Sequence, residues 1–291
     1  MTQAPRSIRS LLFVPGDSPR KFERASSGPA DALILDLEDS VAPANKAQAR
    51  AVTATMLGQT PRRQRLYVRV NAFDTGLTAA DLAVVMAARP DGIVLPKAGG
   101  GDDVRRLAYM LDAFEATHGI APGSTRILPI VTETADSLFA LSSYRDSSPR
   151  LWGLMWGAED LMAALGAYDN RDREAAYTGP FRTARDLCLA AARAAGVEPV
   201  DTVYVDVKNL EGLADECRAA RRDGFSCKAL IHPSHVDVVH EAFQPTAAEI
   251  DWARRVLAAI ESSPADGVFV LDGRMVDQPH IRKARQIIQR V

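Results

Sequence analysis

The chain has 291 residues, of which 47% are hydrophobic and 25% are charged, a composition typical of a globular protein with a full core. The formal net charge is −2, from 35 basic and 37 acidic residues, so the charge balance does not favour binding to nucleic acid. No stretch is long enough for a signal-peptide core or a membrane span, and we expect a cytoplasmic protein that does not bind membranes.

Short apolar runs, rich in Val, Ile and Leu, predict buried parallel strands. Stretches rich in Ala, Leu and Arg, with helical spacing, lie between them. This alternation predicts an α/β fold, a (β/α)8 TIM barrel, over residues 1–233. An open doubly wound sheet is the alternative, but no G-x-G-x-x-G follows the first strand, which disfavours its dinucleotide-binding form. The runs cover residues 10–15, 32–38, 66–71, 92–97, 126–133, 151–157, 202–208 and 228–233.

Residues 234–291 form a C-terminal extension beyond the eighth run. Residues 245–263 are predicted to form a helix, with Thr246 and Glu249 as a capping pair. A strand, an Asp-Gly turn, a second short strand and a last helix starting near Pro279 are expected after it. Closing a barrel does not require such an extension, so we expect it to serve another purpose.

Nearly every predicted strand delivers polar residues to its carboxyl end, where barrel enzymes carry their chemistry. Because side chains alternate along a strand, Asp36 and Glu38 are expected to share one face, and Arg69 and Asn71 another. The polar residues at these ends are Asp36, Glu38, Asp39, Arg69, Asn71, Lys97, Glu133, Glu159, Asp160, Asp206, Lys208 and His232.

Several of these residues allow two interpretations. Glu133 and Asp160 come from consecutive strands and lack His or Cys neighbours, which suits a Mg²⁺ site, but they are also compatible with a salt-bridged pair. Arg69 is suited to clamp a substrate carboxylate or to pair with Asp36 or Glu38, and both can hold. For Lys97 we favour an ion pair over a Schiff base.

A series of motifs gives the chain a family likeness over essentially its whole length. It resembles the citrate lyase β-subunit-like and malyl-CoA lyase family (HpcH/HpaI aldolase/citrate lyase), within the phosphoenolpyruvate/pyruvate-binding barrel superfamily. "DLEDSVAP" and "GRMVDQP" are highly specific, and "VRVN" and "GAEDL" are moderately so. The resemblance implies a Mg²⁺-dependent carbon–carbon lyase, with Mn²⁺ as an alternative ion. Its substrate would be a malyl-, citramalyl- or citryl-CoA, giving acetyl-CoA or a homologue and a 2-oxo acid.

The resemblance also assigns roles at the metal centre. Glu133 and Asp160 match the family's metal ligands, and Arg69 matches the arginine that holds the 2-oxo acid oxygens. The acidic cluster of "DLED" matches the residues that support the metal's waters and Arg69, and it consists of Asp36, Glu38 and Asp39.

Further matches concern coenzyme A and the C-terminal extension. Phe13 and Arg24 match residues that contact the coenzyme A nucleotide in malyl-CoA lyases. Ser18 stands where a second basic residue is common, and Arg20 and Lys21 are candidates to replace it. Asp277 matches the catalytic acid that the tail of one subunit places in a neighbour's active site. Residues 234–291 are therefore expected to act as a lid packed on a neighbouring subunit, in a homo-oligomer (trimer or hexamer) with shared active sites.

Four alternatives remain open at this point. They are a β-subunit acting on a citryl thioester of a carrier protein, a metal-dependent 2-oxo acid aldolase without coenzyme A, a catalytically silent binding subunit, and thioester hydrolysis after cleavage. The intact "GRMVDQP" segment favours a stand-alone coenzyme A enzyme over the first.

Overall fold

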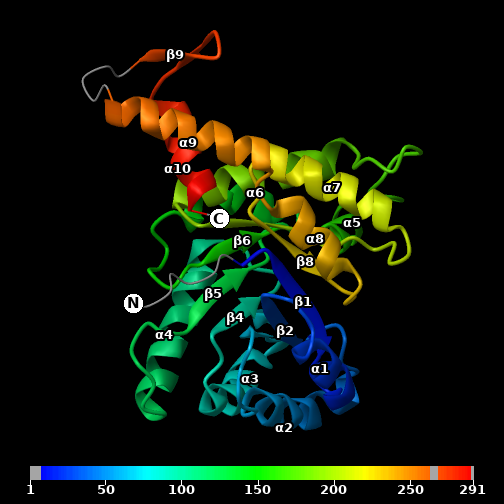
Figure 1. Ribbon diagram of the computed structural model, residues 1–291. Coiled ribbons are helices and arrows are strands. Elements are labelled where there is room, and N and C mark those ends of the chain that lie inside the picture. Colours follow the sequence, from blue (N-terminus) through cyan, green and yellow to red (C-terminus); the bar gives the residue numbers. More distant parts are fainter. Residues whose placement is uncertain (1–7, 263–267, 290–291) are drawn as a thin grey trace. The chain divides into compact units, whose positions relative to one another are not determined.

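The computed structural model describes residues 8–262 and 268–289 of the chain, and parallel strands form its centre (Figure 1). Their order is β5-β4-β3-β2-β1-β8-β7-β6. Parallel bridges from Ile127 to Leu151 and from Ile130 to Met155 link the two outer strands, so the ring nearly closes. This confirms the predicted TIM barrel. The strands are β1 Ser10–Pro15, β2 Ala32–Asp36, β3 Arg65–Arg69, β4 Gly92–Leu95, β5 Arg126–Pro129, β6 Gly153–Met155, β7 Glu198–Asp201 and β8 Cys227–Leu230.

Helices surround the strands and follow them in the chain (Figure 1). Gly196 adopts the left-handed conformation, with φ of 69°, and ends α6, as glycine commonly does at a helix C-terminus. No helix in the described ranges is long and apolar enough to cross a membrane. The helices are α1 Pro19–Ser26, α2 Lys46–Leu57, α3 Thr78–Val85, α4 Gly101–Thr117, α5 Glu159–Leu165, α6 Gly179–Ala195, α7 Leu210–Asp223 and α8 His235–Phe243, with 3-10 helices η1 Pro43–Asn45, η2 Phe73–Thr75, η3 Met86–Ala88 and η4 Asp136–Tyr144.

The barrel interior is filled by side chains from alternate positions of the strands. Ala32 and Ile34 of β2 and Tyr67 of β3 are nearly inaccessible to solvent and belong to one apolar cluster. Burying a large apolar side chain contributes roughly 1.5–3 kcal/mol, so this cluster fixes the register of the strands. The next inward positions of the same strands are Asp36 and Arg69, which lie at the carboxyl ends.

The prediction for the seventh strand is wrong. The strand is Glu198–Asp201, and residues 202–208 form a loop in which Asp206 and Lys208 are exposed. Pro199 lacks the backbone N–H that strands use for pairing, so the sequence of the true strand does not predict a strand. Residues 202–208, by contrast, have the alternation of apolar residues that is typical of one. β7 nevertheless pairs with β8 through Val200 and Asp201.

The chain divides into two compact units, residues 8–240 and a C-terminal part that starts at Glu241. In the second unit, α9 (Ala247–Ser262) packs against α10 (Gln278–Ile288), and β9 (Phe269–Leu271) pairs antiparallel with β10 (Arg274–Val276). The predicted order of helix, hairpin and helix is confirmed, although Ser263 lies outside the described residues. The predicted capping pair is also confirmed, since Thr246 N donates to Glu249 Oε2 at 2.7 Å and Glu249 N to Thr246 Oγ1 at 3.2 Å.

A buried charge network joins the outer face of the barrel to the helices. Lys228 of β8 is fully buried, and its Nζ lies 2.7 Å from Asp201 Oδ2 and 2.9 Å from Glu216 Oε1 on α7. Burial would lower the pKa of Lys228, but the two carboxylates outweigh that effect and raise it above its usual range. The ammonium therefore stays charged and is shared by both carboxylates, which also lie near Arg185 (Asp201, 3.5 Å) and Arg171 (Glu216, 2.7 Å).

We expect Lys228→Ala to lower the free energy of unfolding by about 3–5 kcal/mol, because Asp201 and Glu216 would lose the ammonium that they share and keep only Arg185 and Arg171 as cationic partners. Urea unfolding followed by circular dichroism measures the change. Lys208→Ala is the matched control, since this lysine is exposed in the loop after β7. Equal stability of the two variants would contradict the role given to the network.

Candidate functional site

The carboxyl ends of the strands carry a group of interacting charged side chains. Two cations and four acids make up this group, which we call the mouth cluster. It consists of Arg69, Lys97, Asp36, Glu38, Glu133 and Asp160.

Arg69 and Asp36 form a bidentate pair between neighbouring strands. Arg69 Nε donates to Asp36 Oδ1 at 2.7 Å, and Nη2 donates to Oδ2 at 2.8 Å. Burial would raise the pKa of Asp36, but the hydrogen bonds and charge of Arg69 bring it below the ordinary value. Asp36 also accepts from the backbone N–H groups of Glu38 and Ser40, at 2.9 and 3.1 Å. Asp36 is therefore an ionised group that fixes the guanidinium.

Arg69 retains hydrogen-bonding capacity toward the cavity. Its Nη1 lies 2.8 Å from Glu38 Oε2, at ion-pair distance but outside hydrogen-bond alignment. The guanidinium also lies over the ring of Phe13, with Cζ 4.9 Å from the ring centroid. The expected ion pairs of Arg69 are thus confirmed, and its remaining N–H groups can still bind a carboxylate.

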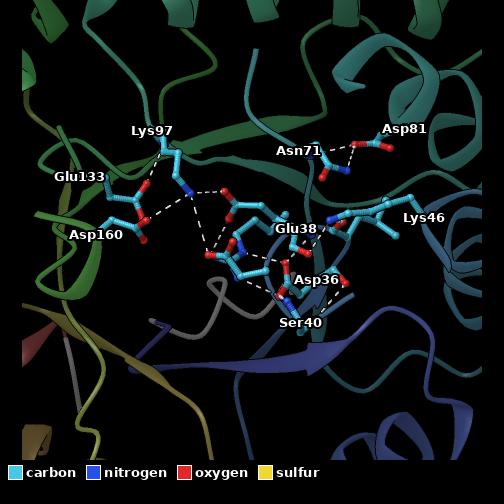
Figure 2. A network of polar contacts seen from close by, with 12 residues as sticks. Asp36, Glu38, Ser40, Lys46, Asn71, Asp81, Lys97, Glu133 and Asp160 are labelled. Carbon is cyan, nitrogen blue, oxygen red and sulfur yellow. Dashed lines mark hydrogen bonds and ion pairs between the residues drawn. The ribbon is translucent and has the colours of Figure 1, made fainter. Parts of the chain in front are cut away.

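Lys97 joins the acidic groups on the two sides of the site (Figure 2). Its Nζ lies 2.5 Å from Glu38 Oε1, 3.4 Å from Asp160 Oδ1 and 3.9 Å from the exposed Asp39. The hydrogen bond and charge of Glu38 raise the pKa of Lys97 although partial burial opposes this. An ammonium held in this state is a poor Schiff-base nucleophile, and the favoured ion-pair interpretation is confirmed.

Glu133 and Asp160 lie side by side, as the sequence predicted for neighbouring strands (Figure 2). Glu133 Oε2 accepts a hydrogen bond from the backbone N–H of Lys97 at 2.5 Å. Gly157 leaves room for this carboxyl group, because a Cβ there would lie 2.8 Å from Glu133 Cγ. A glycine in "WGAED" is therefore required for the close approach of the chain to Glu133.

The electrostatics of Glu133 suit a divalent cation. Its pKa is raised to about 8, mainly by burial and also by the nearby carboxylates of Asp160 and Glu38, while the Lys97 N–H and the charge of Arg69 act in the opposite direction. The described residues contain no group of three or more potential ligands. Mg²⁺ commonly uses one or two carboxylates and completes its shell with water and substrate oxygens, so Glu133 and Asp160 fit this ion.

A cavity of about 640 Å³ opens beside the mouth cluster. Such a volume is typical of small-molecule sites. Its polar end contains Arg69, Asp36, Glu133 and Asp160, and its other walls are largely apolar. Lys21 and Arg24 of α1 line its edge. The apolar part is lined by Leu12, Val14, Ile130, Met155, Val203 and Ile231.

The predictions for three rim residues are wrong. Asn71 lies beyond the end of β3, where strand alternation no longer applies, and its Nδ2 donates to Asp81 Oδ2 at 2.7 Å instead of sharing a face with Arg69 (Figure 2). Asp206 and Lys208 do not line the cavity, whereas Thr202 and Val203, directly after the true β7, do.

Sequence reasoning missed other supporting residues. Lys46 Nζ donates to the backbone carbonyls of Leu37 and Glu38, at 2.7 and 2.6 Å, and so holds the chain in place after β2. Asn170 Nδ2 donates to Glu159 Oε1 at 2.9 Å, next to Asp160. The sequence gives no indication of the Lys46 contacts, because hydrogen bonds from a side chain to backbone carbonyls depend on the path of the chain after β2.

Asp277 belongs to the C-terminal unit. It precedes α10, and its side chain is 33% exposed. His280 Nδ1 lies 2.6 Å from its Oδ1.

The chain is similar to proteins of one known family. Residues 9–233 match the HpcH/HpaI aldolase/citrate lyase family. A (3S)-malyl-CoA thioesterase of Cereibacter sphaeroides is 37% identical over 293 residues, covering 99% of this chain and 96% of that protein. A citrate lyase subunit beta-like protein of Mycobacterium tuberculosis is 37% identical over 280 residues, covering 96% and 94%.

A solved structure shows the same architecture. Protein CitE from Mycobacterium tuberculosis, in complex with magnesium, acetoacetate and coenzyme A, has a TM-score of 0.81 and 35% sequence identity, with 99% of both chains covered. Since a family match over most of the chain coincides with these relatives, the chain belongs to the HpcH/HpaI aldolase/citrate lyase family of enzymes.

Proposed function

We propose that this protein is a Mg²⁺-dependent lyase that cleaves, or forms, the carbon–carbon bond of a 3-hydroxy-dicarboxylyl-CoA such as malyl-, citramalyl- or citryl-CoA. The products of cleavage are acetyl-CoA or a homologue and a 2-oxo acid. The observation that carries the proposal is the meeting of Glu133, Asp160 and Arg69 at the polar end of one cavity. Magnesium and coenzyme A bound to a relative of 35% identity support it.

Glu133 and Asp160 would hold Mg²⁺, which supplies Lewis-acid stabilisation of the 2-oxo acid oxygens when bound. Asp36 and Glu38 position Arg69, and Asp39 lies 3.8 Å from its Nη1. All three acids are suited to hold water near the cation as well.

Arg69 binds the carboxylate of the 2-oxo acid fragment with the N–H groups left free by Asp36. Its fixed charge is already oriented, so little reorganisation is needed as negative charge develops on this fragment. The apolar wall of the cavity excludes water from the enolate of the thioester, which water would otherwise protonate.

Lys21 and Arg24 at the edge of the cavity are suited to bind the phosphates of coenzyme A. We assign to Lys21 the phosphate contact that a basic residue in the position of Ser18 would otherwise make. Phe13 lies under Arg69, where it can contact the acyl end of the substrate as well as support the guanidinium.

Asp277 is our candidate acid and base. In condensation it would remove a proton α to the thioester, and in cleavage it would return that proton. We propose that residues 234–291 form a lid that brings Asp277 to the active site of a neighbouring subunit, in a homo-oligomeric trimer or hexamer. Three apolar residues of the hairpin region are exposed and offer a surface for such packing, namely Val268, Val270 and Met275.

Thioester hydrolysis is the second candidate, and the name of the Cereibacter sphaeroides relative favours it. Cleavage of malyl-CoA gives glyoxylate and acetyl-CoA without free thiol, whereas hydrolysis gives malate and free coenzyme A. A citrate lyase subunit acting on a carrier-bound thioester is a third, supported by the name of the Mycobacterium tuberculosis relative.

An assay of thiol release and 2-oxo acid formation tests the proposal. Malyl-, β-methylmalyl-, citramalyl- and citryl-CoA are supplied with Mg²⁺ or with EDTA. We expect Mg²⁺-dependent formation of a 2-oxo acid from at least one of them. Thiol release without 2-oxo acid would support hydrolysis, and turnover that persists in EDTA would exclude the metal mechanism.

We expect Mg²⁺ affinity to rise about tenfold per pH unit between pH 6 and 8 and then to level off, because Glu133 must lose its proton to bind the ion. Since the pKa of Glu133 is raised in the folded state, the metal-free protein should also lose stability as pH rises toward 8. Calorimetric titration with MgCl₂ measures the affinity. The Glu133→Gln variant should bind weakly at every pH, and a pH-independent affinity of the unmodified protein would refute this assignment.

The double variant Lys21→Ala/Arg24→Ala should raise KM for the acyl-CoA about tenfold or more while kcat changes little, because phosphate contacts bind ground state and transition state alike. Steady-state kinetics at low and high salt test this. Arg20→Ala is the matched control, since Arg20 is exposed on the same helix but does not line the cavity. Equal effects of the control and the double variant would exclude a specific phosphate site.

Asp277→Ala should retain Mg²⁺ binding but lose turnover by about 100-fold or more. If the acid acts across subunits, mixing this variant with Arg69→Ala protein should restore part of the activity, because some mixed sites then contain both residues. Subunit exchange is verified by differently tagged chains. A complete lack of recovery after proven exchange would argue against the shared site.

A further inference from the structure

Asp277 and His280 form a close side-chain pair at the start of α10. His280 Nδ1 lies 2.6 Å from Asp277 Oδ1, and the backbone N–H of Asp277 is directed at the same Nδ1 over a nitrogen–nitrogen distance of 3.3 Å. The other ion pairs near the hairpin are separate, since Arg255 lies 2.7 Å from Asp272 and 3.0 Å from Asp251. Among the described residues, only His280 lies within ion-pair distance of Asp277. The proposed mechanism gives the histidine no role.

The short contact requires one proton between the two side chains. A ring nitrogen can donate or accept, but it cannot do both at once. If Nδ1 carries hydrogen, it donates to Oδ1 of an ionised Asp277. If Nδ1 is bare, a carboxylate at 2.6 Å would face its lone pair, so the carboxyl group must carry the proton instead. In both states Oδ1 is engaged by the His280 ring. The carboxyl group also accepts the backbone N–H of His280, but its two oxygens offer about four lone-pair sites, so acceptor capacity remains for a substrate.

We infer that His280 is a positioning residue for the catalytic carboxyl group of Asp277, an inference that rests on the proposed function. Its Nδ1–H donates to Oδ1 at 2.6 Å, in place of accepting the longer contact from the Asp277 N–H, and holds the carboxyl group in one orientation. Both side chains are partly exposed, at 33% for Asp277 and 44% for His280, so the pair is accessible to a substrate.

The proton transfer can be written with this pair. In condensation, the C–H bond α to the thioester breaks, its electron pair enters the enolate, and an O–H bond forms at Oδ2. His280 keeps its Nδ1 proton throughout. In cleavage, Oδ2–H returns the proton to the enolate carbon, and the carboxylate is restored. The hydrogen bond also stabilises the ionised form that acts as the base.

A purely structural role of His280 is the competing explanation. Asp277 immediately precedes α10, and His280 occupies the third helical position, where a side chain commonly accepts the backbone N–H of the capping residue. Glu and Gln both serve this function well. The two replacements differ in how they interact with the Asp277 carboxylate. Gln can donate an N–H to it, whereas Glu has no such donor and its negative charge repels the carboxylate.

The test compares His280→Gln with His280→Glu in the full-length protein, using the most active acyl-CoA of the assay above as probe. We expect kcat to fall roughly threefold in the Gln variant, whose neutral amide is a weaker donor. In the Glu variant we expect kcat to fall about 100-fold, as for a displaced catalytic group. KM should change less than twofold in both. Incorporation of deuterium from D₂O into acetyl-CoA, with Mg²⁺ and oxalate present, reports proton removal directly and should follow kcat.

Melting temperatures show whether the helix start survives. If the added charge lowers the melting temperature of the Glu variant, His280→Met replaces it, since Met has the length of Gln without a donor or a charge. The inference would be overturned if His280→Gln and the variant without a donor had the same kcat and the same rate of deuterium exchange, whether both rates were high or low.

Asp277→Asn separates this result from the proposed function, because Asn caps a helix as well as Asp does but cannot take up a proton. Full activity of Asp277→Asn would show that Asp277 is not the acid, and the proposed function would fail at that point. An inactive Asp277→Asn with equal Gln and Glu variants would overturn the role of His280 alone.

Discussion

The bidentate contact between Arg69 and Asp36 is the interaction on which the mouth of the barrel depends. It joins the last residues of two neighbouring strands, and it is buried, so removal of either partner would leave the other charge poorly compensated. Asp36 also accepts two backbone N–H groups of the turn that carries Glu38. The pair therefore fixes both the guanidinium of Arg69 and the turn after β2 before any substrate binds.

The charge balance of the mouth cluster explains why a cation suits it. Its four carboxyl groups would carry two more negative charges than its two cations can offset if all were ionised. The raised pKa values of Glu38 and Glu133 express this surplus, since burial and neighbouring carboxylates make their ionisation costly. A divalent cation between Glu133 and Asp160 would relieve it, so the chemistry of the site and its electrostatics favour the same ligand.

Much of this arrangement could be predicted from the sequence, because strands place side chains with a period of two. Ala32, Ile34 and Asp36 face the interior in turn, and the carboxyl end of the strand follows from the apolar run. The prediction failed where regular structure ends. Asn71 lies just past β3 and turns to Asp81, and the loop after β7 resembles a strand only in its composition.

Contacts between side chains and loop backbone could not be predicted from the sequence either. The hydrogen bonds of Lys46 to two carbonyls depend on the path of the chain after β2, which no local pattern encodes. The His280–Asp277 contact differs, since a spacing of three residues at a helix start is a recognisable motif. Its chemical use could not be predicted without the 2.6 Å distance.

Lys97 has a left-handed backbone conformation, with φ of 52°, which is uncommon for a residue with a side chain. Its backbone N–H holds Glu133, while its ammonium holds Glu38 and approaches Asp160. The backbone N–H and the ammonium of this one residue thus contact the two acids of the proposed metal site separately. During divergence of the family, a glycine or asparagine here would keep the amide that orients Glu133 and would remove only the ammonium beside Asp160. The orientation of one ligand and the charge around the other can therefore evolve independently at this single position.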